Sequence, residues 1–482
     1  MSSPIQKLPE ASSPDRSATP PAAGSGSAAP GAGLPARLRQ RHMTMIGLGG
    51  AIGAGLFVGS GAAIAVAGPG VLVSFVLAAL LTVLIMRMMG EMSVALPASG
   101  SFSTHAERAW GSWAGFTIGW LYWSLMVVVI AIEAMGAAVI VNGWLPGVDT
   151  WVWVLLFMAA LTVANLAAVG TFGEFEFWLA VLKVGAIIGF LILGTLAVAG
   201  ALPGEKAIGF NNLTQHGGFL PHGWSGVVSG LLIVIFSFGG IEIVTLAAAE
   251  STDPVRALGS AMRSAIWRLL LFYIGSMAVA VTVLPWNDSK VGKSPFVAVL
   301  ERIGVPGAAQ VMNVVLLAAL LSALNANLYA SSRMIYSLAE RGEAPQALRK
   351  LSRTGVPRHA VLVSVAFGFF SVLLNFKWPD TVFLWLLNSV GIIGLVVWIA
   401  VAVTQLRLRS QLERTTPERL RLRVWGFPWL TILALMAMAA VIGLLAVDEE
   451  SRPQVVGSGA LTALFLTLGV VRHRRRITSG TG

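Results

Sequence analysis

Five glycines lie within the eleven residues Gly49–Gly59, inside an apolar stretch that starts just after the basic residues Arg39 and Arg41. This spacing predicts a membrane helix that is interrupted near its midpoint. In hydrocarbon every backbone amide and carbonyl must find a partner, so irregular backbone persists only where protein or a water-filled cavity surrounds it. An interrupted membrane helix therefore indicates a binding site.

The composition supports a membrane location for the whole chain. Hydrophobic residues make up 56% and charged residues 11% of the 482 residues, and the mean hydropathy is +0.78, which excludes an ordinary soluble domain. Runs of about 20 apolar residues are long enough to span a bilayer. We predict an all-α integral membrane protein with twelve transmembrane helices, near 43–66, 71–95, 115–141, 151–169, 177–200, 225–249, 264–285, 307–336, 359–376, 381–404, 425–446 and 455–471.

The net charge of +11 reflects membrane topology rather than nucleic-acid binding. With the N-terminus in the cytoplasm, most Lys and Arg residues fall in the inner segments, as the positive-inside rule requires. Both termini are then cytoplasmic. Residues 1–36, rich in Pro, Ala, Gly and Ser, are predicted to be a disordered tail rather than a signal peptide, and residues 473–482 form a second tail. The chain has no cysteine, which excludes disulfides and thiol chemistry.

A second interruption is predicted in the sixth span, at Ile235–Glu242, where paired glycines are followed by a carboxylate. It lies five spans after the first, as an inverted repeat of five plus five helices predicts. Repeat one then covers about 43–200, repeat two about 225–404, and the two C-terminal helices about 425–471. The alternative is that these glycines only allow close helix packing.

The two interruptions together suit a zwitterion. The exposed amides of the first favour an anion such as a carboxylate, and free carbonyls near Phe236–Gly239 suit an ammonium group. The candidate substrate-binding residues are Ala51, Ile52, Gly53, Ala54, Gly55, Phe236, Phe238, Gly239 and Glu242.

Lys183, Glu133 and Glu242 lie well inside predicted spans, where charges are expensive and commonly functional. Lys183 is the candidate for coupling to a proton gradient, since burial favours its neutral amine; the alternative is snorkelling to an interface. Glu242 carries a proton, binds the unwound backbone or belongs to a gate. Glu133 should face the bundle interior, in a functional or a structural role.

Other polar and aromatic residues have less defined roles. Ser322, Asn325 and Asn327 either line a cavity or tie helices together, and Phe57 either closes over substrate or packs. Arg87 and Glu91 are expected to be cytoplasmic anchors or gate ion pairs. The sequence shows no metal-ligand spacing and no phosphate-binding GxxxxGK[ST] motif, so we expect neither metal, cofactor nor enzymatic activity.

Several segments resemble the amino acid permeases of the amino acid–polyamine–organocation superfamily, from residue 37 to about 470. They are Arg41–Ile46 with the glycine break, Glu91 with Pro97–Thr104, Gly115–Trp123, Ala248–Pro254 and Ser331–Ala339. Gly173–Ala180, before Lys183, and Glu242–Thr245 make the chain most similar to the bacterial 4-aminobutyrate (GABA) permeases within that superfamily.

The resemblance implies a leucine-transporter-type fold with broken helices 1 and 6 and proton symport at the plasma (inner) membrane. It places the substrate carboxylate on Ala54 and Gly55, the amino group near Phe236 and Gly239, and Lys183 against the helix 1 break, where sodium-coupled relatives hold an ion. We predict a secondary active transporter that imports GABA or a similar small amino acid with protons by alternating access. A permease or exchanger for another neutral or aromatic amino acid is the first alternative, and a non-transporting amino acid receptor the second.

Overall fold

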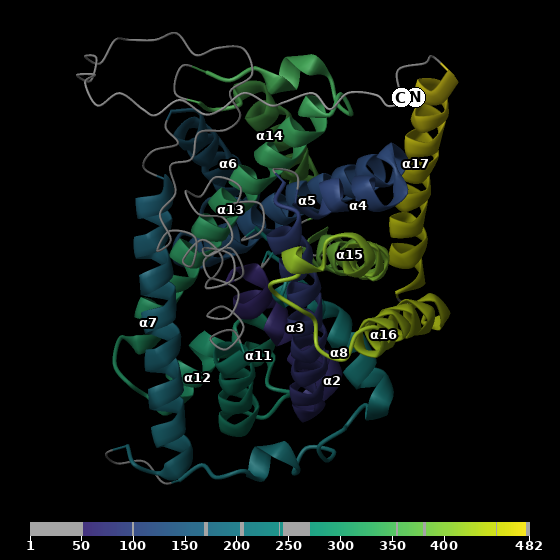
Figure 1. Ribbon diagram of the computed structural model, residues 1–482. Coiled ribbons are helices and arrows are strands. Elements are labelled where there is room, and N and C mark those ends of the chain that lie inside the picture. Colours follow the sequence, from purple (N-terminus) through teal and green to yellow (C-terminus); the bar gives the residue numbers. More distant parts are fainter. Residues whose placement is uncertain are drawn as a thin grey trace, which may run out of the picture. The chain divides into compact units, whose positions relative to one another are not determined.

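The computed structural model describes residues 52–98, 101–167, 172–202, 207–240, 242–243, 270–352, 355–378, 382–449 and 451–478. These residues form helices and connecting segments, with no strand among them, which confirms the predicted all-α class (Figure 1). The predicted tail 1–36 lies outside the described residues. The principal helices are α2 (Ser60–Ala67), α3 (Val71–Ala95), α4 (Ser101–Trp110), α5 (Ser112–Trp144), α6 (Thr150–Ala167), α7 (Phe172–Ala199), α8 (Gly223–Ser237), α11 (Ser289–Lys293), α12 (Pro295–Ile303), α13 (Ala308–Glu340), α14 (Arg358–Lys377), α15 (Val382–Thr415), α16 (Trp429–Val447) and α17 (Arg452–Thr478).

Short helical turns complete the described elements. The 3₁₀ turns are η2 (Gly68–Gly70), η3 (Asn211–Leu213), η4 (Gln346–Arg349) and η5 (Pro417–Arg419), and η1 (Gly55–Gly59) is a π-helix. Within the described part of the chain, eight helical stretches are long and apolar enough to cross a membrane, and three shorter apolar helices cover 150–166, 223–237 and 270–283. The first long stretch, Gly55–Ala95, includes the turn at Gly68–Gly70. The count of twelve spans stays a prediction.

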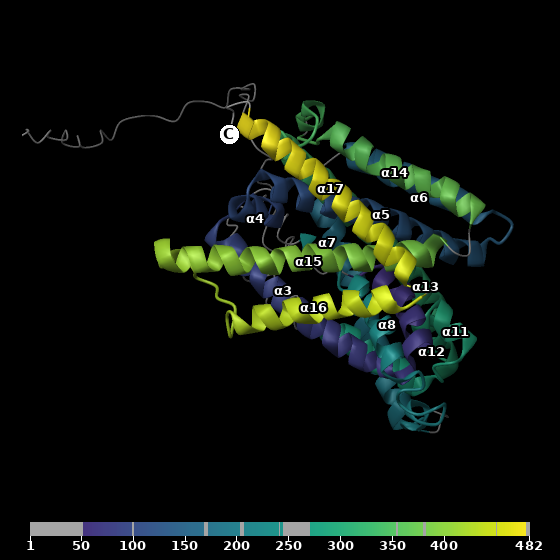
Figure 2. The same ribbon diagram turned by 90° about the vertical axis from the view of Figure 1, so that its right-hand side faces the viewer.

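The helices α5 and α13 pack against each other and provide the frame of the bundle. Each is 33 residues long, and each is the third span of its predicted repeat. The C-terminal pair α16 and α17 packs beside α15, outside the two predicted repeats (Figure 2). The frame thus joins one helix from each predicted repeat.

The chain turns sharply between α2 and α3 because of its glycines. Gly68 has a φ of 60°, a left-handed conformation that glycine adopts without steric cost, and Pro69 follows it in the short turn η2. A Cβ on Gly68 would also clash with the Pro221 ring. This turn reverses the chain so that α3 can pack against α8.

Three helices lie outside the predicted spans. The helix α4 follows α3, and α11 and α12 precede α13. Both α4 and α12 have one apolar and one polar face, and α12 is stopped by Gly304 in a left-handed conformation. Such helices lack the continuous apolar run on which span detection depends. The structure also continues α15 to Thr415 and α17 to Thr478.

Candidate functional site

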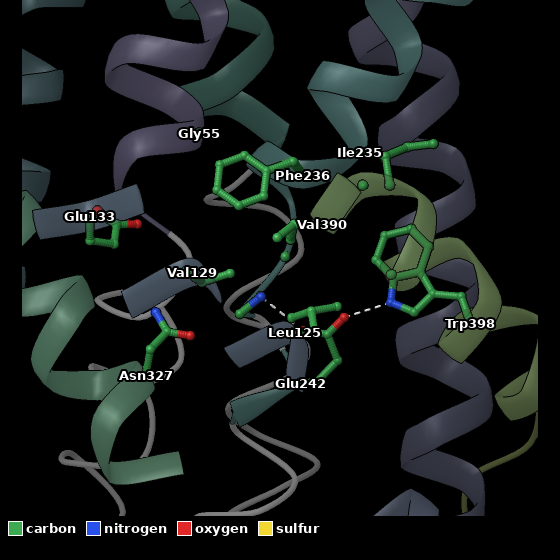
Figure 3. A pocket seen from close by; sticks show the side chains of 14 residues that line it. Gly55, Leu125, Val129, Glu133, Ile235, Phe236, Glu242, Asn327, Val390 and Trp398 are labelled. Carbon is green, nitrogen blue, oxygen red and sulfur yellow. Dashed lines mark hydrogen bonds between the residues drawn. The ribbon is translucent and has the colours of Figure 1, made fainter. Parts of the chain in front are cut away.

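A buried cavity lies where the two predicted interruptions meet α5, α13 and α15 (Figure 3). Its volume is about 40 Å³, enough for one water molecule but not for an amino acid. The residues that line it are Gly55, Leu125, Val129, Glu133, Ile235, Phe236, Gly239, Gly240, Glu242, Asn327, Val390, Gly391, Gly394 and Trp398. We call it the central cavity.

The first interruption presents the start of a helix to the central cavity. Ile52 and Gly53 are bent, and a helical conformation begins at Ala54 and continues through η1 into α2. The amide of Ala54 donates to both carboxylate oxygens of Glu133, at 3.1 and 3.0 Å. Ala51 and the predicted inner half of this span lie outside the described residues.

Glu133 thus holds the amide that the sequence assigned to a substrate carboxylate. Its side chain is buried, and it lies at the positive end of the helix dipole. Gly53 permits this approach, because a Cβ there would collide with the Glu133 carboxylate. The structure therefore shows that this helix end accommodates a carboxylate, supplied in this case by the protein itself.

The second interruption follows α8. The helix ends at Ser237, and Gly240 has a φ of 89°. The carbonyls of Ile235 and Phe236 accept hydrogen bonds from the amides of Phe238 and Gly239, at 3.1 and 2.9 Å. Of the predicted carbonyls, that of Phe236 is thus partly engaged and keeps one lone pair for an ammonium group.

Glu242 fastens this interruption to α15. One carboxylate oxygen accepts the amide of Gly240 at 2.9 Å, and the other accepts the indole N–H of Trp398 at 2.5 Å (Figure 3). Both Glu242 and Glu133 line the central cavity. Two carboxyl groups at a small buried cavity provide acceptor oxygens for a cationic group.

The two interruptions touch each other at Gly55. A Cβ on this glycine would lie 2.5 Å from the Cα of Ser237 and 3.1 Å from the Phe236 ring. Because Gly55 has no side chain, the helix start at Ala54 and the helix end at Ser237 come together at the cavity wall. The sequence predicted both interruptions, and the structure adds their direct contact.

Lys183 does not line the central cavity. Its side chain is completely buried, which excludes snorkelling, and its Nζ is 3.9 Å from an Oε1 atom of the equally buried Glu176. It also interacts electrostatically with Glu133. Lys183 therefore interacts with two carboxyl groups, one of which contacts the first interruption.

The remaining predicted residues divide between the cavity and the packing around it. Of the α13 residues, Asn327 lines the central cavity, Ser322 donates to Glu176 at 2.6 Å, and Asn325 accepts from Asn165 at 2.7 Å. Phe238 stacks on Tyr273 and Phe57 packs edge-on against Phe296, so both rings belong to the surrounding packing.

Arg87 and Glu91, the predicted cytoplasmic anchors or gate ion pairs, each contact a residue near the end of α15. Arg87 donates to the carbonyl of Arg423 at 3.0 Å and lies over the ring of Trp425. Glu91 forms a buried ion pair with Arg409 of α15. Both residues thus anchor α3 to the segment around the end of α15.

The sequence did not single out Glu176 or Trp398. Glu176 is seven residues before Lys183, a spacing that places both on one helix face, and this signal was available. Trp398 offers no comparable signal, because nothing in the α15 sequence indicates that its indole reaches Glu242. No group of His, Asp and Glu suited to a metal ion occurs among the described residues.

Interrupted apolar helices around a buried polar cavity define a membrane transport protein. The amino acid permease family model matches residues 42–472, and the chain belongs to this family. It is thus a multi-pass membrane permease for amino acids and not an enzyme.

Relatives of known name support this assignment. The chain is 49% identical to the gamma-aminobutyric acid permease of Bacillus subtilis (strain 168), over 92% of this chain and 95% of that protein. It is 45% identical to the aromatic amino acid transport protein AroP of Corynebacterium glutamicum, over 93% and 97% of the two chains. A manganese transporter from Eremococcus coleocola shares the fold, with a TM-score of 0.59 and 13% identity over 90% of this chain and 94% of that one.

Proposed function

We propose that this permease imports GABA or a similar small amino acid together with protons, by alternating access around the central cavity. It does so in the plasma membrane with both termini in the cytoplasm. The gamma-aminobutyric acid permease of B. subtilis, at 49% identity over nearly the whole chain, supports the choice of substrate.

The contact between Glu133 and the Ala54 amide carries the proposal for substrate binding. A helix start whose Ala54 amide already binds one carboxylate is suited to another, so the substrate carboxylate would bind the Ala54 and Gly55 amides while Glu133 moves aside. The substrate ammonium would then lie near Glu242 and the carbonyls of Phe236 and Gly239. Ile52, Gly53 and Phe238 would support this arrangement from behind.

The small volume of the central cavity supports alternating access. A cavity of about 40 Å³ must widen to admit any amino acid, and Phe236 and Trp398 are the large side chains in its wall. Movement of the interrupted helices relative to α5 and α13 would open it to one side of the membrane at a time. The described structure then corresponds to a contracted state.

Lys183 is the proposed proton carrier. A buried amine flanked by Glu133 and Glu176 changes its interactions whenever Glu133 leaves the Ala54 amide. Substrate binding and proton binding would be linked through that carboxylate.

Uptake of labelled GABA into proteoliposomes tests the coupling. An inwardly directed pH gradient should drive accumulation by the intact protein, and Lys183→Ala should abolish the effect of the gradient. Uptake by the intact protein that ignores the gradient would exclude proton coupling. Saturable binding without uptake under any gradient would indicate an amino acid receptor instead.

The substrate is tested by competition with amino acids of graded chain length. GABA and its neighbours in length should compete best if the Glu242 carboxylate receives the ammonium group of an ω-amino acid. The 45% identical AroP protein favours a second candidate, an aromatic amino acid. Stronger competition by phenylalanine or tryptophan than by GABA would select it.

A further inference from the structure

Glu176 is a buried carboxylate for which neither substrate binding nor packing gives a sufficient reason. Its side chain is completely buried near the start of α7. Lys183 follows two helical turns later, about 10 Å further along the axis. The two charges face the same interior region, and the Lys183 Nζ approaches the Glu176 Oε1 to 3.9 Å.

The hydrogen bonds of Glu176 are incomplete. Oε1 accepts the Ser322 hydroxyl at 2.6 Å, whereas Oε2 is buried and has no hydrogen-bond partner within the described part of the chain. A buried ion pair that serves only stability needs close contact and satisfied lone pairs, since desolvation otherwise exceeds the attraction. An unpartnered buried carboxylate oxygen calls for another explanation, and one is that it receives a proton.

Lys183 connects Glu176 to the first interruption. It interacts electrostatically with both Glu176 and Glu133, and Glu133 holds the Ala54 amide. In the proposed orientation α7 runs from the cytoplasmic side outward, so Glu176 is on the inner side of Lys183. The three groups therefore form a series from the central cavity toward the cytoplasm.

The other groups around this series are few among the described residues. The helix α13 packs on α7 and supplies the neutral Ser322. Residues 270–283 supply Tyr273, which interacts electrostatically with Glu133. The helix α12 packs on α7 through Phe296 and Phe190. Its charged residues Glu301 and Arg302 are exposed.

We propose that Glu176 is the inward proton acceptor of Lys183, an inference that rests on the proton coupling proposed above. An N–H bond of the Lys183 ammonium breaks and an O–H bond forms at Glu176 Oε2, which leaves a neutral amine and a neutral carboxylic acid. The acid then releases its proton to water on the cytoplasmic side. Rotation of the flexible lysine stem shortens the 3.9 Å separation during the transfer.

The experiment compares Glu176→Gln with the intact protein in proteoliposomes. It uses labelled GABA, or the best transported amino acid of the competition panel. Glu176→Gln should lower pH-gradient-driven accumulation about tenfold or more. Equilibrium exchange of substrate, which requires no net proton release, should stay within about twofold, and its dependence on internal pH should flatten. Glu301→Gln, the same change in an exposed outer ion pair, should leave all three measurements unaltered.

The outcomes separate this proposal from the one on which it rests. An intact protein that ignores the gradient excludes proton coupling altogether, and with it any proton role of Glu176. A gradient-driven intact protein whose Glu176→Gln variant accumulates substrate equally well overturns only the role of Glu176. A variant that loses exchange and accumulation together indicates a structural partner of Lys183 and also overturns it.

A second variant, Glu176→Asp, tests the proposal if the first one does not fold. If Glu176→Gln does not yield folded protein, Glu176→Asp retains a carboxylate on a shorter side chain. Its driven uptake should persist with a displaced pH profile, because the acceptor is further from Lys183. A profile identical to that of the intact protein would contradict the proposal.

Discussion

The contact between the two interruptions depends on a single missing side chain, that of Gly55. Its Cα faces the Ser237 backbone, and a Cβ would approach the Ser237 Cα to 2.5 Å. We expect Gly55→Ala to separate the two helix ends and to reduce substrate uptake about tenfold or more. Uptake rates and substrate Kd, measured on the purified variant, test this expectation.

Gly185→Ala is the matched control for Gly55→Ala. Gly185 lies in α7, where a Cβ would meet no atom within 4 Å, so the added methyl group should be tolerated and even slightly favour the helix. Equal uptake by both variants would show that the close approach at Gly55 is dispensable. Loss in both would point to a general sensitivity of the bundle.

The sequence identifies candidate site residues where the residue type is energetically unfavourable inside a membrane helix. Glycines within a helix, and Lys183, Glu133 and Glu242 within apolar spans, stand out because hydrocarbon penalises them. Glu176 was not predicted, because it lies just outside the apolar run 177–200. Partners such as Trp398 and Ser322 depend on the arrangement of distant helices, which no local pattern specifies.

At the scale of elements, α4 carries a pH-sensitive contact outside the spans. His105 is buried, its Nε2 lies 2.8 Å from the Leu96 carbonyl, and burial lowers its pKa to about 4. A lowered pKa means that its contribution to stability is present above its ordinary value of about 6.5 and is lost as the pH falls toward 4. Protonation of His105 in the folded state should cost about 3 kcal/mol.

We expect His105→Gln to reduce the drop in Tm between pH 7.5 and pH 4.5, because the glutamine has no proton to gain. Thermal unfolding of the detergent-solubilised protein at the two pH values measures this difference. The exposed His359 provides His359→Gln as a control, which should retain the full drop. The same drop in His105→Gln would mean that other groups cause the acid sensitivity.

A second connection joins the ends of α3 and α15 through Glu91. Its carboxylate accepts hydrogen bonds from Arg409 at 2.6 Å, Gln405 at 2.9 Å and the Val424 amide at 2.5 Å. Glu91→Gln leaves the buried Arg409 without its full counter-charge and should destabilise the protein by about 3 kcal/mol. Thermal or denaturant unfolding in detergent measures the loss.

The control for Glu91→Gln uses the other partner of Arg409. Glu413 bonds the same guanidinium at 2.9 Å but is 43% exposed, so Glu413→Gln should change stability by at most about 1 kcal/mol. Equal effects of the two changes would contradict a special role for the buried contact.

The limits of sequence-based prediction differ among elements. Long apolar helices such as α5, α13 and α15 were placed correctly because hydrocarbon-length runs identify them. Their extensions, and the amphipathic helices α4 and α12, were missed because no apolar run continues there. At the second interruption, the hydrogen bonds from Phe238 and Gly239 depend on the backbone conformation after α8, which the sequence does not determine.

At the scale of the whole molecule, the distribution of basic residues predicts which ends of the helices face the cytoplasm. Outer loops contain few Lys and Arg residues, whereas the segment after α13, the end of α15 with the loop that follows it, and the end of α17 contain many, as the positive-inside rule describes. The same orientation places Glu176 on the inner side of Lys183, so the proposed proton path depends on it. Chemical labelling of introduced cysteines from one side of the membrane tests the membrane orientation and, with it, the direction of the proposed proton path.

The chain has no cysteine. A single introduced cysteine is therefore the only site that a maleimide can label, and no native cysteine has to be removed first. Gln215, between α7 and α8, and Gln411, near the end of α15, are both exposed. A membrane-impermeant maleimide added to intact cells should label Gln215→Cys directly and Gln411→Cys only after permeabilisation. The reverse pattern would invert the membrane orientation, and Glu176 would then lie on the outer side of Lys183, where it would accept protons on entry rather than release them inward.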